Sequence, residues 1–60
     1  MYKCIKPITC ISELSGHRIG IAVDDLVTVH RKEPSVAFEF NGNPIRLSKD
    51  EFNEHFNEVK

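Results

Sequence analysis

The stretch from Val36 to Phe56 decides the fold of this 60-residue chain and reads VAFEFNGNPIRLSKDEFNEHF. It contains all four phenylalanines, which are the largest apolar side chains in the sequence. Its hydrophobic pattern predicts a strand, a tight turn, a second strand and then a helix. We therefore expect the hydrophobic core to form around this segment.

The two strands of this stretch are predicted to form a hairpin. The apolar residues of Val36–Phe40 share one face, because side chains alternate along a strand. The dipeptide Asn41-Gly42 favours a tight turn, because both residues tolerate positive φ. A two-residue loop would place Phe38 opposite Ile45, and a four-residue loop would place Phe38 opposite Leu47. Both keep the apolar residues on one face, and the proline after the turn slightly favours the longer loop.

A helix is predicted after the hairpin, over about residues 49–59. Ser48 is its expected N-cap, because Glu51 follows three residues later in the spacing of a capping box. Acidic residues in the first turn suit the positive end of the helix dipole. One apolar stripe at i, i+4 and i+7 should face the core: Phe52, Phe56 and Val59.

The N-terminal half is predicted to add shorter strands. Tyr2–Ile11 is expected to be one strand that lies at an edge or bends at Pro7, because proline donates no ladder hydrogen bond. Ser12–Arg18 reads as a polar loop and Ile19–Val23 as a short apolar segment. Leu26–His30 is rich in β-branched residues and predicts a strand, whose two inward-facing valines should join the Phe face.

These elements predict a β-rich α+β fold in a single domain covering residues 1–60. The expected architecture is a small antiparallel β-meander or SH3-like barrel of four or five short strands with one C-terminal helix. A three-stranded sheet packed on the helix is the alternative. A chain of this length buries only about 60% of the surface that its unfolded form exposes, so we expect no deep cleft between lobes.

Composition limits the classes of function. The net charge of −1 weighs against strong non-specific binding to nucleic acid. No apolar run approaches the roughly 20 residues that span a bilayer, and the N-terminus lacks the pattern of a secretory signal. A cytoplasmic location without membrane contact is therefore expected.

No catalytic, cofactor or metal site is expected from the reactive residues. Cys4 and Cys10 lie on one predicted strand, roughly 20 Å apart along extended chain, which is too far for a disulfide. They are expected to be buried thiols. A zinc site normally contains a close ligand pair, whereas these cysteines and the histidines are scattered along the chain: His17, His30 and His55.

A non-enzymatic binding role is the remaining hypothesis. A basic face or the acidic face of the helix could dock a protein of opposite charge, and an edge strand containing Pro7 could pair with another chain or form a homodimer. The alternative is nucleic-acid binding by a basic face, with Tyr2 as a stacking group. The candidate binding residues are Tyr2, Lys3, Lys6, Arg18, Arg31, Lys32, Glu51, Glu54 and Glu58.

The chain opens with MYKCIK at residues 1–6, continues through a compact meander, and closes with LSKDEF at residues 47–52 followed by Phe56. In this plan it resembles short proteins encoded by tailed bacteriophages and prophages. The resemblance covers most of the chain and carries no functional residue with it. It implies an accessory or regulatory factor that binds a host or phage protein, in the host cytoplasm, rather than catalysing a reaction.

Overall fold

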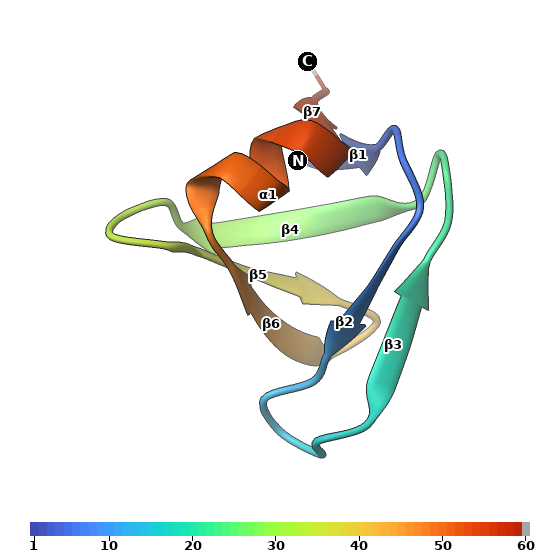
Figure 1. Ribbon diagram of the computed structural model, residues 1–60, viewed down its shortest axis with the longest axis vertical. Coiled ribbons are helices and arrows are strands. Elements are labelled where there is room, and N and C mark those ends of the chain that lie inside the picture. Colours follow the sequence, from blue (N-terminus) through green and yellow to red (C-terminus); the bar gives the residue numbers. More distant parts are fainter. Residues whose placement is uncertain (60) are drawn as a thin grey trace.

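The computed structural model describes residues 1–59, which contain seven strands and one helix. Five strands form an antiparallel sheet in the order β6-β5-β4-β1-β7, and β2 and β3 form a separate two-stranded ladder (Figure 1). The expectation of a strand-rich antiparallel domain with one C-terminal helix is confirmed. The expected four or five strands are seven, because residues 2–11 form two strands and another strand follows the helix. The elements are β1 Tyr2–Cys4, β2 Ile8–Ile11, β3 Arg18–Ile21, β4 Leu26–Arg31, β5 Val36–Phe40, β6 Asn43–Leu47, α1 Lys49–His55 and β7 Phe56–Glu58.

The β5–β6 hairpin has a two-residue loop, so the preference for a longer loop was wrong. Phe38 lies opposite Ile45, and Phe40 lies opposite Asn43. The reason is the backbone conformation at the turn, where φ is 51° at Asn41 and 80° at Gly42. Two successive positive φ values define the type I′ turn, whose twist matches that of the flanking strands.

The proline of the hairpin is accommodated because β6 is an edge strand. Pro44 lies opposite Glu39, next to a pair that exchanges hydrogen bonds, so its own backbone groups point away from β5. The β5–β6 ladder therefore loses no hydrogen bond through the absence of an N–H at Pro44. On the same edge, the Pro44 carbonyl oxygen accepts a hydrogen bond from the Glu13 N–H at 2.8 Å.

The expected single strand over Tyr2–Ile11 is two strands in two different sheets. β1 ends at Cys4, the chain bends through Ile5, Lys6 and Pro7, and β2 then pairs with β3. The predicted bend at the proline is confirmed. The intact strand was wrong, and β1 is not an edge, because β4 lies on one side of it and β7 on the other.

The terminal helix begins as predicted but ends four residues early. The Ser48 hydroxyl accepts a hydrogen bond from the Glu51 N–H at 3.2 Å, which confirms the N-cap. At Phe56 the backbone turns extended, with φ −135° and ψ 146°, and β7 pairs with β1. The predicted stripe is therefore wrong at its end, because Val59 lies beyond both elements and is 41% exposed.

The core lies between the five-stranded sheet, α1 and the inner face of the β2–β3 ladder. Three phenylalanine rings are in mutual contact at its centre, with centroid distances of 5.3 Å for Phe38–Phe52, 5.4 Å for Phe38–Phe56 and 4.6 Å for Phe52–Phe56. The buried apolar residues are Cys4, Cys10, Ile21, Val27, Val36, Phe38, Ile45, Phe52 and Phe56. Within residues 1–59, the one helix is too short and too polar to cross a membrane.

The type I′ turn gives a direct test of the hairpin. We expect Gly42→Ala to lower the free energy of unfolding by about 1–2 kcal/mol, because a side chain disfavours the left-handed backbone conformation. Gly20→Ala is the matched control, since Gly20 has no positive φ and nothing lies within 4 Å of an added Cβ. Urea denaturation of both variants in dilute solution measures the difference, and equal losses would contradict the turn assignment.

Candidate functional site

A shallow pocket of about 180 Å³ opens between the first turn of α1 and the segment that joins β4 to β5. Four parts of the chain meet there: the start of β1, the β4–β5 connection, the start of β5, and α1. Its lining residues are Tyr2, Lys32, Glu33, Val36, Lys49, Phe52 and Asn53. We call this feature the Tyr2 pocket.

The floor of the Tyr2 pocket is apolar. Phe52 and Val36 are buried, and Tyr2 is half-buried beside them. The Tyr2 ring meets the Phe52 ring edge-on, with centroids 5.0 Å apart and planes at 68°, an orientation that aromatic pairs prefer. Tyr2 faces inward because it has the same parity on β1 as the buried Cys4. An apolar group entering the pocket would therefore meet fixed aromatic surface.

The rim of the Tyr2 pocket is charged. The Lys32 ammonium lies 5.0 Å from the centroid of the Tyr2 ring, which is within cation–π range. Tyr2 is the main cause that raises the pKa of Lys32, and Glu58 adds to the rise, so Lys32 is cationic at neutral pH. Glu33 forms an ion pair with Lys49. Within residues 1–59, no carboxylate lies within ion-pair distance of Lys32.

The predicted basic residues do not gather on one face. Lys3 pairs with Asp24 at 3.8 Å, and Lys6 pairs with Glu54 at 3.3 Å. Arg18 is exposed on β3, away from the five-stranded sheet. Together with the half-burial of Tyr2, this dispersal weighs against a stacking platform on a basic face, which is what nucleic-acid binding would use.

The predicted acidic face is also divided. Glu51 and Glu54 are exposed on α1, but Glu58 lies on β7, opposite Tyr2, because the helix ends before it. The structure thus brings three of the nine predicted residues to one place: Tyr2 and Lys32 line the pocket, and Glu58 lies beside them.

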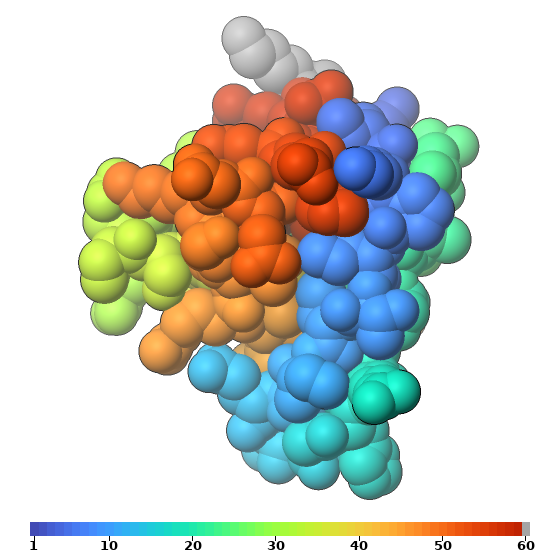
Figure 2. All heavy atoms as spheres, viewed as in Figure 1, coloured from blue at the N-terminus to red at the C-terminus, as the bar shows by residue number. Residues whose placement is uncertain are grey.

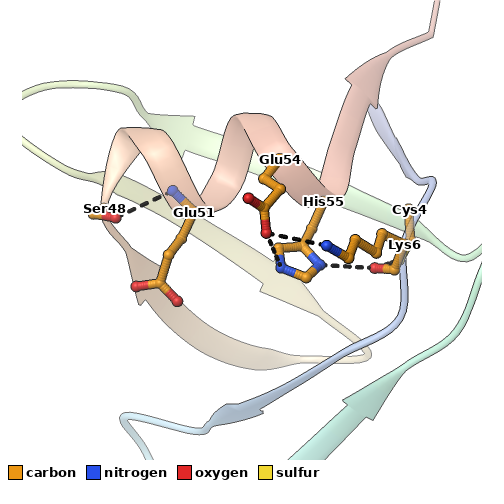
Figure 3. A network of polar contacts seen from close by, with 6 residues as sticks. All are labelled: Cys4, Lys6, Ser48, Glu51, Glu54 and His55. Atoms are coloured by element: carbon orange, nitrogen blue, oxygen red, sulfur yellow. Dashed lines mark hydrogen bonds and ion pairs between the residues drawn. The ribbon is translucent and has the colours of Figure 1, made fainter.

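Figure 3 shows that Lys6, Glu54 and His55 form a corner that holds the end of α1 to the bend after β1. The His55 Nδ1 donates to the Lys6 carbonyl oxygen at 3.0 Å, and the Ile5 N–H donates to the His55 carbonyl oxygen at 2.7 Å. The Cys4 thiol donates to the same Lys6 oxygen at 3.1 Å. These contacts satisfy backbone groups at a helix end, so the polar residues of this corner have a structural role.

Sequence reasoning missed five residues of the Tyr2 pocket. Val36 and Phe52 were assigned to the core alone, because hydrophobic periodicity shows which side chains face inward but not where the core reaches the surface. The others come from separate segments and meet only through the fold: Glu33, Lys49 and Asn53. One signal was present in the chain, namely the charged KEPS sequence at 32–35 between two strongly apolar strands.

The thiols and potential metal ligands do not form a reactive centre in the described chain. Burial is the main cause that raises the pKa of Cys4 and of Cys10 above 9.0, and raised values disfavour the reactive thiolate. Both cysteines are unpaired and buried, as expected, although they reach the core from two separate strands. No group of three or more histidines, cysteines or acids within residues 1–59 is arranged to hold a metal ion.

The buried thiols predict a pH dependence of stability. The unfolded chain ionises its cysteines above pH 9.0, whereas the folded protein retains the thiol protons, so the free energy of unfolding should fall as pH rises above 9.0. Chemical denaturation from pH 8 to pH 10.5 measures this fall. The free energy of unfolding of a Cys4→Ala, Cys10→Ala double variant should fall less steeply with pH, and equal slopes for the two proteins would contradict the assignment.

No protein-family model matches the sequence, no curated protein matches it, and no solved structure matches the fold.

Proposed function

We propose that this protein is a small non-enzymatic binding module that acts through protein–protein contact, and that the Tyr2 pocket receives a side chain of the partner. The pocket itself carries the proposal: an apolar, aromatic floor is open to solvent and edged by charged residues. Interface hot spots have this form, with an apolar or aromatic anchor enclosed by a polar rim. The most suitable anchor is a large apolar side chain near an acidic group, because Lys32 has no ion-pair partner in the described chain.

We also propose that the fold is an SH3-like barrel. The meander β4–β5–β6, which β1 and β7 extend beyond β4, supports it. So does the hydrogen bond from Glu13 to Pro44 between the β2–β3 loop and the edge of β6. Small barrels of this class bind peptides at aromatic-lined surface grooves. A phage or prophage origin, with action in the host cytoplasm, rests on the sequence resemblance alone.

A non-enzymatic role is supported by the chemistry of the chain. The thiols are buried and protonated, and the histidine nearest the core, His55, is engaged by the Lys6 carbonyl oxygen and Glu54. General acid–base catalysis needs a titrating group within reach of a substrate. The Tyr2 pocket offers contact surface instead, together with Lys32, which has no ion-pair partner among residues 1–59.

The proposal is tested by blocking the pocket. Asn53→Trp places a large side chain on its rim, and Asn57→Trp places the same side chain on β7, where Asn57 lies opposite the exposed Lys3. Both positions are exposed, so neither change should unfold the protein. Immobilised wild-type protein and Asn57→Trp should retain the same proteins from bacterial host lysate, and Asn53→Trp should lose them with at least a tenfold drop in affinity, about 1.4 kcal/mol.

Circular dichroism of the two variants confirms that both are folded before the comparison. Retention of the same proteins by Asn53→Trp would refute the pocket as the contact surface. A wild-type protein that retains nothing specific would refute the binding function.

A further inference from the structure

The β2–β3 ladder is a separate sheet that lies along one side of the molecule, at the lower right in Figure 1, and packs directly against the other elements in Figure 2. Its inner face packs on the core through Cys10 and Ile21, with Ile8 and Ile19 half-buried beside them. Two strands alone make a marginal sheet. The outer edges of this ladder are therefore the places where the fold can still gain backbone hydrogen bonds.

The pairing register fixes which backbone groups point outward. Cys10 lies opposite Ile19, and the Ser12 N–H donates to the His17 carbonyl oxygen at 2.9 Å. Hydrogen-bonded pairs alternate along an antiparallel ladder, so Ile19 bonds inward to β2. The N–H and C=O groups of Arg18 and Gly20 then point away from β2, and neither residue makes a backbone hydrogen bond on that side within residues 1–59.

The two edges of the ladder differ in what lies beyond them. On β2 the outward groups belong to Thr9 and Ile11, and the next residue of that parity, Glu13, donates its N–H to Pro44 on β6. The edge of β2 is thus directed toward β6. The edge of β3 faces away from the rest of the molecule, and no strand of the described residues lies beyond it (Figure 1). Arg18 and Gly20 are solvent-exposed, and we call their side of β3 the open edge.

The outer face beside this edge is hollowed. Gly20 has no side chain, and nothing lies within 4 Å of the position that a Cβ would take. A wide, open depression of about 330 Å³ lies there, lined by Pro7, Ile8, Thr9, Gly20, Ile21 and Ala22. The one long side chain of β3 on the same face is Arg18, two residues away.

We propose that the open edge of β3 pairs with the same edge of a second copy of this chain, antiparallel and two-fold symmetric about Ile19. Arg18 of each copy then lies opposite Gly20 of the other, and each such pair exchanges two backbone hydrogen bonds. Ile19 lies opposite its symmetry mate, in the close type of pair that favours β-branched contacts. The aliphatic stem of each Arg18 covers the hollow over the partner's Gly20. The same surface of each copy therefore supplies both the projecting side chain and the hollow that receives it, as a two-fold contact requires.

Charge favours the antiparallel arrangement. Arg18, at the start of β3, is in no ion pair within residues 1–59. Past the end of β3, the Asp25 carboxylate lies at the Ala22 N–H, 2.9 Å away, and Asp24 precedes it. Antiparallel pairing brings the basic start of each β3 toward the acidic end of the other, whereas parallel pairing would bring like charges together. A second copy is therefore the occupant that fits this edge in hydrogen bonding, shape and charge.

The first test needs only the wild-type protein. Sedimentation equilibrium should show a reversible rise toward twice the mass of one chain as concentration increases. Amide hydrogen exchange followed by NMR should show that the Arg18 and Gly20 N–H groups become more protected over the same range, while those of Thr9 and Ile11 stay unchanged. A protein that stays monomeric at every concentration overturns the proposal. So does a dimer in which the Arg18 and Gly20 amide protons exchange at the monomer rate. In either case the edge would be open to an extended segment of another protein.

The second test compares two proline variants of the same ladder. Gly20→Pro removes an outward N–H from β3 and puts the ring on the open edge, whereas Thr9→Pro removes the opposite outward N–H from β2. Neither change removes a β2–β3 hydrogen bond. We expect the dimer dissociation constant to rise at least about tenfold in Gly20→Pro and to stay near the wild-type value in Thr9→Pro. Equal effects in two folded variants would refute the assignment to β3. The Tyr2 pocket is not involved, so failure of this contact leaves the proposed function intact.

Discussion

The pairing of the two ends of the chain is the interaction on which the rest of this structure depends. β1 carries three residues and β7 carries three, yet their ladder places Cys4 opposite Phe56 and Tyr2 opposite Glu58. This pairing pulls Phe56 out of the helix and into contact with Phe38 and Phe52. It also covers the edge of β1 that β4 leaves open. Without it, a chain of this size would lose part of an already small core.

The same pairing explains where sequence reasoning succeeded and where it failed. The capping of α1 by Ser48 and the inward parity of Val36 and Phe38 are local patterns, and both were predicted correctly. The end of the helix depends on a contact between residues about fifty positions apart, which no local pattern contains. The Phe56 side chain faces the core whether the helix continues or a strand begins. The hydrophobic pattern therefore did not distinguish the two conformations.

The hairpin shows a local conflict that tertiary position resolves. Asn41-Gly42 favoured a short loop and Pro44 favoured a long one, and the answer depended on whether β6 lies at an edge. Because it does, the proline nitrogen faces outward and the turn residues prevail. The Tyr2 pocket was beyond prediction for a related reason: Tyr2, Lys32 and Phe52 come from three separate segments, and the sequence identified the first two only as members of a larger dispersed set.

The two proposed contact surfaces lie in different parts of the structure. The Tyr2 pocket lies at the start of α1, and the open edge of β3 lies on the separate ladder (Figure 1). The two surfaces have no lining residue in common, so a two-fold contact through β3 leaves both pockets accessible. Such a dimer presents two identical pockets on one body, and a partner with two matching segments would bind the second at a high effective concentration. Because the Tyr2 pocket is shallow, pairing two copies would be a physical route to useful affinity.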